Sequence, residues 1–282
     1  MALRSIVART LRKPAELSGV GLHSGQTVTV RILPAAAGDG ITFVRTELPV
    51  RTVVKVTDVV NDAAPFRTVI RNAGAEIHTI EHLMSALCGL GITDARIEIS
   101  GVEVPGMDGS ALKFSEAVQA AGMEDLSSRA SALVLDTAVT IEDGMARLNA
   151  LPNPGGLKIS YTLNYPGQPI AQGFFEIEVN AETFVRDIAP ARTFAIKKDA
   201  EAMRAAGLGK GANLQNTVVI DGDKVLETKL RFSNEPVRHK ILDLIGDLSV
   251  LGRPLHAHIV ARCSGHKQNR ELALKIRETH GL

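Results

Sequence analysis

One stretch of the chain carries three ionisable side chains at helical spacing. Within residues 237–248, His239, Asp243 and Asp247 follow one another at intervals of four residues. Read as a helix, the stretch has an apolar stripe on its other face. The stripe consists of Val237, Ile241, Leu244, Ile245 and Leu248. An imidazole and a carboxylate at i, i+4 can hold one divalent cation, so the pattern predicts a metal site on a buried helix.

A second stretch, within residues 78–90, repeats this arrangement. Glu81 stands beside His82, and His78 shares their predicted helix face. The opposite face is apolar, with Ile80, Leu83, Met84, Leu87 and Leu90. A carboxylate beside a metal-binding imidazole could take a proton from a metal-activated water molecule. The two stretches are far apart in the chain, so only folding could join these two halves of a metal site.

The composition is that of an ordinary globular protein and argues against a nucleic-acid partner. The 282 residues are 45% hydrophobic and 4% aromatic, and 32 Lys plus Arg against 31 Asp plus Glu give a net charge of +1. A protein that binds a nucleic-acid backbone favours a basic surplus. No apolar run approaches the roughly 20 residues of a membrane span, so we expect no transmembrane segment. Contact with a membrane surface is left open.

The two cysteines and the N-terminus indicate a cytoplasmic protein. Cys88 and Cys263 follow neither a metal-binding spacing nor a disulfide framework. The first 14 residues lack the apolar core of a secretory signal. A reducing compartment is the simplest interpretation.

The order of predicted elements indicates an α+β fold with two domains, residues 1–126 and 127–282. In the first half, strands at 27–33, 41–45 and 53–57 precede the Glu81 helix, a strand at 95–99 and a helix at 111–121. The polar residues 124–129 look like a linker. In the second half, strands at 133–141, 146–150 and 157–163 precede the Asp243 helix, a strand at 255–262 and a helix at 269–279.

Each half also contains a histidine followed seven residues later by a glycine. The pairs are His82 with Gly89, and His239 with Gly246. The shared order suggests a structural duplication in which like helices face each other and bring both histidines together. One segment, at about residues 195–221, has no counterpart in the first half and is interpreted as an inserted β-α-β excursion.

Several short motifs, taken together, resemble the UDP-3-O-acyl-N-acetylglucosamine deacetylases of lipid A synthesis. They occur in order over essentially the whole chain. The motifs lie at residues 19–25 (GVGLHSG), 81–83 (EHL), 107–110 (MDGS), 191–194 (ARTF), 237–243 (VRHKILD), 245–248 (IGDL) and 264–266 (SGH). No single motif is specific, but the combination is.

The resemblance implies a fold, a cofactor and a substrate. The implied fold is two similar sheet-plus-helix domains in a duplicated β-α-α-β sandwich, each with an insert. One catalytic Zn2+, which Fe2+ could replace, would be bound by His82, His239 and Asp243. Three nitrogen and oxygen ligands with one open position are typical of catalytic zinc. The substrate would be a UDP-linked acylated amino sugar whose N-acetyl group is released as acetate, and the enzyme is expected to be a monomer.

The resemblance also implies a role for each remaining polar residue. Glu81 would accept a proton as water attacks the amide carbonyl. Thr193 and Lys240 would hold the resulting oxyanion. His266 would protonate the departing amine, and Asp247 would keep its imidazolium charged and oriented.

The insert is expected to shield the fatty-acid chain. By resemblance, it forms an apolar passage beside the zinc, and Phe194, Met203 and Leu208 are the candidate substrate-binding residues. The family often carries a Lys just before the Ser-Gly-His turn, where this chain has Cys263. The contacts to the nucleotide phosphates therefore stay undetermined.

Two other interpretations compete with the deacetylase. Residues 78–82 read H-x-x-E-H, the inverted zinc-peptidase signature, in which His78 and His82 bind zinc and Glu81 is the base. That interpretation leaves Asp243 and His266 without a function. A non-catalytic scaffold, in which zinc only joins two domains, does not explain a Glu beside one ligand and a Lys beside another.

Overall fold

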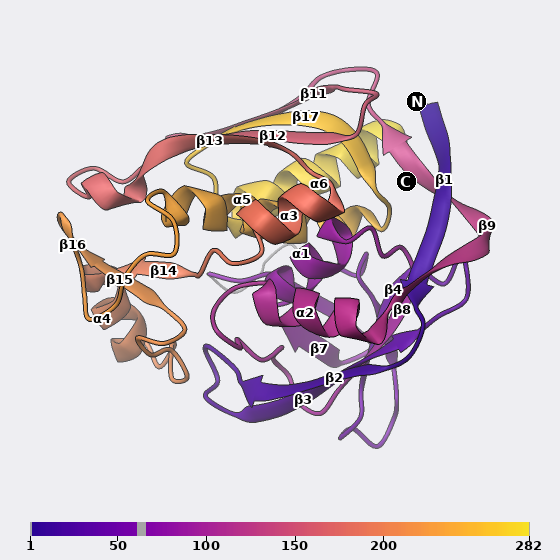
Figure 1. Ribbon diagram of the computed structural model, residues 1–282, viewed down its shortest axis with the longest axis horizontal. Coiled ribbons are helices and arrows are strands. Elements are labelled where there is room, and N and C mark those ends of the chain that lie inside the picture. The colour runs from indigo at the N-terminus through magenta and orange to yellow at the C-terminus, as the bar shows by residue number, and fades with distance from the viewer. Residues whose placement is uncertain (1, 61–65, 282) are drawn as a thin grey trace.

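Two β-sheets enclose a layer of helices in the computed structural model, which describes residues 2–60 and 66–281 (Figure 1). The strands of the first sheet are β2 (Ala15–Val20), β3 (Thr27–Pro34), β4 (Ile41–Arg45), β5 (Val53–Lys55) and β8 (Ala95–Ile99). They lie in the order β2-β3-β8-β4-β5, and only β4 and β8 run parallel. Buried and more exposed side chains alternate along β3, as expected for a sheet with one face against a core.

The second sheet has seven strands and is built around the last strand of the chain. Its strands are β1 (Ala2–Leu11), β9 (Met123–Val134), β10 (Val139–Asp143), β11 (Ala146–Pro152), β12 (Leu157–Asn164), β13 (Gln172–Glu178) and β17 (Leu255–Arg262). Strand β17 pairs antiparallel with β11 and parallel with β12 and with the end of β9.

The polar residues 124–129, predicted as a linker, lie inside strand β9, so that prediction is wrong. They pair antiparallel with β1, and Arg9 Nε lies 2.6 Å from Asp125 Oδ1 across the pair. Most of these side chains are exposed. A strand without a buried face keeps a polar composition, which is why it resembles a linker in the sequence.

Five helices and two short 3₁₀ turns occupy the space between and beside the sheets in the described ranges. They are α1 (Glu81–Gly89), α2 (Leu112–Ala121), α3 (Ala181–Asp187), α5 (Glu235–Leu248), α6 (His266–His280), η1 (Pro169–Ala171) and η2 (Ser249–Leu251). Helix α1 packs against α5 and α2, and α5 also contacts α6 and β12. The predicted α+β class is confirmed. Across residues 2–60 and 66–281, no helix is both long and apolar enough to cross a membrane.

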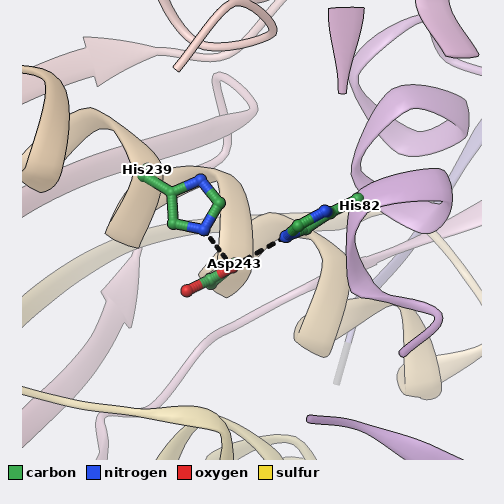
Figure 2. Close-up of side chains that lie close together, drawn as sticks. All are labelled: His82, His239 and Asp243. Atoms are coloured by element: carbon green, nitrogen blue, oxygen red, sulfur yellow. Dashed lines mark ion pairs between the residues drawn. The ribbon is translucent and has the colours of Figure 1, made fainter. Parts of the chain in front are cut away.

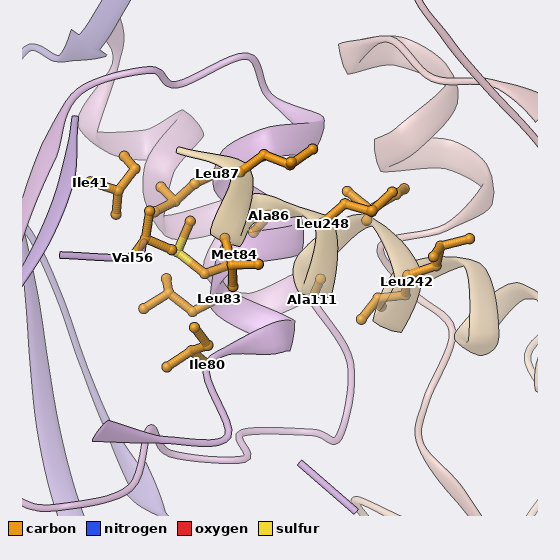
Figure 3. Close-up of a cluster of buried hydrophobic side chains, with 14 of the residues drawn as sticks. Ile41, Val56, Ile80, Leu83, Met84, Ala86, Leu87, Ala111, Leu242 and Leu248 are labelled. Atoms are coloured by element: carbon orange, nitrogen blue, oxygen red, sulfur yellow. The ribbon is translucent and has the colours of Figure 1, made fainter. Parts of the chain in front are cut away.

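Helices α1 and α5 approach each other until their backbones touch. Figure 3 shows Leu83 and Leu87 of α1, and Leu242 and Leu248 of α5, in the buried apolar cluster. The approach is closest at Gly246, where a Cβ atom would lie 2.0 Å from the backbone oxygen of Glu81. Only a residue without a side chain fits there, so glycine sets the distance between the two helices.

The segment predicted as a β-α-β excursion forms a separate small sheet with one helix. The predicted segment covers β14 (Phe194–Ile196), α4 (Lys197–Ala205) and β15 (Val218–Asp221), and β16 (Lys224–Val225), just beyond it, completes the sheet. Strands β14 and β15 are parallel, and β16 continues the sheet antiparallel. Figure 1 shows this group at one end of the molecule, away from β1 and β9. A second small sheet, the hairpin of β6 (Val69–Asn72) and β7 (Ala75–His78), leads into α1.

We expect Gly246→Ala to lower the free energy of unfolding by about 1–3 kcal/mol, because the added methyl group must push α1 and α5 apart. Denaturant unfolding of the purified protein measures this change. Gly155→Ala is the matched control, since a Cβ there would meet its nearest atom, Asn153 Oδ1, at 3.4 Å. Equal stability of the two variants would contradict the proposed helix contact.

Candidate functional site

Three potential ligand side chains converge between helices α1 and α5 (Figure 2). His82 comes from the first turn of α1, and His239 and Asp243 from one face of α5. Asp243 Oδ1 lies 3.2 Å from His239 Nε2 and 3.8 Å from His82 Nε2. One donor atom of each residue lies within 4.8 Å of the other two, and all three side chains are buried. Folding therefore brings together the three residues predicted as metal ligands.

The chemistry of this group fits a divalent cation. Asp243 Oδ1 is buried and has no hydrogen-bond partner among the described residues. His239 Nδ1 lies 3.0 Å from the Ala191 carbonyl oxygen, to which it must donate, so in the neutral ring the lone pair is on Nε2, on the side of Asp243. Burial and the neighbouring His239 ring lower the pKa of His82 to about 3, so this imidazole is neutral at pH 7. Two imidazole nitrogens and one carboxylate oxygen are a donor set that suits zinc and iron(II).

Lys240 neutralises the other oxygen of Asp243. Its Nζ lies 2.8 Å from Asp243 Oδ2. Burial opposes the charge of Lys240, but the Asp243 carboxylate outweighs burial and raises the pKa of the ammonium group. Burial likewise disfavours the Asp243 carboxylate, but His239, Lys240 and His266 hold its pKa well below the usual value. Both groups stay charged at neutral pH.

Glu81, Asp247 and His266 form a second group beside the first. His266 Nδ1 lies 2.9 Å from Asp247 Oδ2, and its Nε2 lies 3.9 Å from Glu81 Oε1. Burial raises the pKa of Glu81 to about 7. Burial alone would lower the pKa of His266, but the carboxylates of Asp247, Asp243 and Glu81 raise it to about 9. Near neutral pH the group therefore combines a carboxylate that can accept a proton with an imidazolium that can donate one.

This second group is better suited to proton transfer than to holding a cation. Its donor atoms also lie within 4.8 Å of one another. A protonated imidazole has no lone pair to offer, however, and His266 is protonated at neutral pH.

Asp247 is held by two residues that the sequence analysis missed. Thr68 Oγ1 donates to Asp247 Oδ1 at 2.6 Å, and Asn269 Nδ2 donates to Oδ2 at 2.8 Å. The helix predicted to begin at Asn269 begins instead at His266. Gly265 has extended backbone and is the N-cap residue of this helix. Helical spacing from His266 could have indicated Asn269. Thr68 is 179 residues from Asp247 in the chain, and no local pattern marks it.

A buried ion pair fixes the segment that carries Thr193. Arg192 Nε lies 2.9 Å from Glu235 Oε1, and the Arg192 backbone N–H donates to the same oxygen at 3.0 Å. Glu235 is the first residue of α5. The pair therefore anchors the Ala191 carbonyl and Thr193 to the helix that carries the candidate ligands. Glu235 was not predicted, because the sequence places it 43 residues from Arg192.

A cavity of about 1110 Å³ is lined by all three residues of the first group and by Glu81 and His266 of the second. Its polar wall includes Glu81, His82, Thr193, His239, Lys240, Asp243 and His266. Its apolar wall includes Phe194, Ile196, Met203, Leu214 and Val219, which come from the inserted segment. The Phe194 ring lies 6.4 Å from the ring of His239, so the apolar wall begins next to the candidate ligands.

Leu208, predicted with Met203 and Phe194 for the acyl passage, is not among the residues that line this cavity within the described part of the chain. Helix α4 ends at Ala205, and Gly207 adopts φ +77°, which turns the chain back. The Leu208 N–H then donates to the Met203 carbonyl oxygen at 2.9 Å. Because of this turn, Met203 lines the cavity and Leu208 does not.

His78 does not share the polar face of α1, so that part of the sequence interpretation is wrong. His78 is the last residue of β7, and its Nε2 lies 2.9 Å from Glu76 Oε2. Thr79 has φ +56°, and α1 begins only at Glu81. The inverted peptidase needs His78 and His82 on one helix turn, and the structure offers no such turn.

Comparison with known proteins agrees with this geometry. A family model described as UDP-3-O-acyl N-acetylglycosamine deacetylase matches residues 8–278. A UDP-3-O-acyl-N-acetylglucosamine deacetylase of Myxococcus xanthus is 42% identical over 95% of this chain and 85% of its own length. Relatives with the same name from Synechocystis sp. and Chromobacterium violaceum are each 40% identical over 97% of this chain, and over 100% and 91% of their own lengths.

Replacing His82 with Ala should lower the bound metal from one equivalent per chain to a small fraction of that, because one of three ligands is lost without leaving a buried charge unpaired. Elemental analysis of the purified protein, reconstituted with zinc and dialysed, measures the content.

His78→Ala is the matched control and should keep its zinc. Loss of zinc in His78→Ala with full zinc in His239→Ala would instead support the peptidase arrangement. Full zinc in His82→Ala would remove His82 from the ligand set.

Proposed function

Because this chain belongs to the UDP-3-O-acyl-N-acetylglucosamine deacetylase family, we propose that it hydrolyses the N-acetyl amide of a UDP-linked, 3-O-acylated N-acetylglucosamine in lipid A biosynthesis. One observation carries the proposal. His82, His239 and Asp243 converge in the same cavity as the proton acceptor Glu81 and the proton donor His266. Metal-assisted hydrolysis of an amide uses a Lewis acid that polarises the carbonyl, a base that takes a proton from water and an acid that protonates the departing amine.

We infer that His82, His239 and Asp243 hold one zinc ion, with iron(II) as the alternative. A cation held there would polarise the amide carbonyl and bring the pKa of a water molecule to about 7. Support comes from the buried, unpartnered Asp243 Oδ1 and from the His239 lone pair directed at it. The protein supplies all remaining steps.

Proton transfer is assigned to Glu81 and His266. Glu81 accepts the proton of the attacking water, whose oxygen forms the new bond to the acetyl carbon. As the C–N bond breaks, His266 Nε2 gives its proton to the departing amine, and acetate is released. Asp247 stabilises the imidazolium through the 2.9 Å contact with Nδ1 and keeps Nε2 directed into the cavity.

Thr193 and Lys240 are assigned to the developing oxyanion. Both line the cavity, and Lys240 carries its positive charge at neutral pH. A hydroxyl and an ammonium group in a water-poor cavity stabilise new negative charge strongly, because they are already oriented. The Arg192–Glu235 ion pair limits the movement of Thr193 and so preserves this orientation.

The acyl chain is assigned to the apolar wall of the inserted segment. Phe194 and Met203 line this wall, and the Phe194 ring lies 6.4 Å from the ring of His239. Each methylene buried there contributes about 0.8 kcal/mol, so a long chain could supply more affinity than most polar contacts. Leu208 does not line the cavity, and its proposed role is to hold the turn after α4 in place through its N–H bond to the Met203 carbonyl oxygen.

The proposal extends to the whole molecule. We infer two domains, residues 1–126 and 127–282, that arose by duplication in a β-α-α-β sandwich, with α1 and α5 as equivalent helices. Support comes from the contact between these helices and from the 5.1 Å between the ring centroids of His82 and His239. The proposed boundary lies within β9, so the two halves would share a continuous strand. We propose a monomer that acts in the cytoplasm, in line with the free Cys88 and Cys263.

Replacing either proton-transfer residue should abolish most activity while keeping the metal. Glu81→Gln and His266→Gln should each lower kcat by about 100-fold or more, since each removes one proton transfer from the transition state. Acetate release from UDP-3-O-acyl-N-acetylglucosamine is the assay, with zinc content measured in parallel. Glu98→Gln, which weakens the ion pairs with Arg31 and Arg96 and leaves the cavity lining unchanged, is the control. Wild-type turnover in either variant removes that residue from the mechanism, and no acetate release by the wild-type protein refutes the proposed function.

A charge in the apolar wall should impair only substrates with a long acyl chain. Met203→Asp should raise KM for a long-chain substrate by about tenfold or more, because a buried carboxylate displaces several methylene contacts. A substrate with a truncated chain should be nearly unaffected. Ala202→Asp, on the exposed side of α4, is the matched control. Equal effects on long and short substrates would refute the passage and leave the hydrolytic chemistry standing.

A further inference from the structure

A single buried threonine contacts both proton-transfer groups of the site. Thr68 has no exposed surface and lies directly before β6. Its backbone N–H donates to Glu81 Oε2 at 3.1 Å, and its hydroxyl donates to Asp247 Oδ1 at 2.6 Å. Asp247 in turn accepts from His266 Nδ1. Thr68 thus contacts the proton acceptor directly and the proton donor through one carboxylate.

Arg270 fixes the direction of the Thr68 hydroxyl. Its Nη1 lies 3.4 Å from Thr68 Oγ1 and donates at 3.1 Å to the Arg67 carbonyl oxygen. A guanidinium can only donate, so the Thr68 oxygen accepts on that side. The hydroxyl hydrogen is then free only for Asp247. The result is a directed series of hydrogen bonds from Arg270 through Thr68 to Asp247.

The backbone holds Thr68 against the start of α1. The Thr79 N–H donates to the Thr68 carbonyl oxygen at 2.9 Å. Thr79 has φ +56°, and the chain turns there from β7 into the helix that begins with Glu81. Arg270 belongs to α6 and follows His266 by about one helical turn. Thr68 is therefore hydrogen-bonded both to the turn that leads into α1 and to Arg270 of α6.

We propose that Thr68 is a positioning residue that sets the relative placement of the proton acceptor and the proton donor. Its amide orients the Glu81 carboxylate, and its hydroxyl holds Asp247 in the rotamer that directs His266 Nε2 into the cavity. A hydrogen bond of 2.6 Å to a carboxylate belongs to the strong class, so its loss frees Asp247 to turn. The inference rests on the proposed deacetylase function.

Substitution can separate the two contacts of Thr68. Valine has nearly the same shape as threonine and keeps the backbone N–H to Glu81, but it has no hydroxyl for Asp247. Serine keeps both. Thr10 offers a matched control, because it is also buried and its hydroxyl accepts one hydrogen bond, from the Ala35 N–H at 3.0 Å, in another part of the fold.

The test compares kcat and KM for Thr68→Val, Thr68→Ser and Thr10→Val on the UDP-sugar substrate, with zinc content and Tm for each. Thr68→Val should lower kcat by about tenfold or more and change KM by less than about twofold, because substrate binding does not use the hydroxyl. Thr68→Ser should recover most of the lost kcat. Thr10→Val should keep kcat even where its Tm falls. If Thr68→Val does not fold, Thr68→Ala replaces it in the same comparison.

A double-mutant cycle with Asp247→Asn asks whether Thr68 acts through Asp247. In that background, Thr68→Val should change kcat by less than about twofold, since the group it orients is already altered. If Thr68→Val lowers kcat by the same factor in the Asp247→Asn background as in the wild-type protein, the inference is overturned. Wild-type kcat in the single variant Thr68→Val would also overturn it. Either result leaves the proposed function intact as long as the wild-type protein releases acetate.

Discussion

The backbone contact between α1 and α5 is the constraint on which the site depends. Gly246 allows the Glu81 backbone to lie against α5, and this closeness places His82 beside His239 and Asp243. A wider separation would leave two half-sites, neither able to gather three ligands. The apolar residues of both helices stabilise the contact, so the energy that assembles the site comes from hydrophobic burial rather than from the polar groups themselves.

Burial and the neighbouring carboxylates together then set the protonation states of Glu81 and His266. Glu81 and His266 are only 3.9 Å apart at their nearest atoms, and the same low-dielectric surroundings act on both in opposite directions. The Glu81 carboxyl has its pKa raised to about 7, whereas the carboxylates around His266 raise the imidazolium pKa to about 9. One carboxylate and one imidazolium can therefore coexist near neutral pH.

Sequence reasoning succeeded where chemistry and local periodicity coincide. His239 and Asp243 lie one helical turn apart, so their spacing alone predicted a shared face. It failed where tertiary contacts decide. Residues 124–129 are polar because their strand is exposed, and His78 ends strand β7 instead of sharing a face of α1. Thr68 and Glu235 could not be found at all, since their partners are distant in the chain and any buried polar residue would look the same in the sequence.

The hydrogen bond between Lys240 and Asp243 has a consequence for metal selection. Since Lys240 occupies Oδ2, Asp243 can offer a cation only Oδ1, and the proposed site among the described residues then supplies three donor atoms, two of them nitrogen. Mg2+ requires an octahedral shell of oxygen atoms, and Ca2+ takes six to eight. Two imidazole nitrogens and one carboxylate oxygen do not match either preference, although both ions are abundant in cells. A cation held by these three donor atoms would therefore be zinc or a transition metal such as iron(II), the two candidates proposed above.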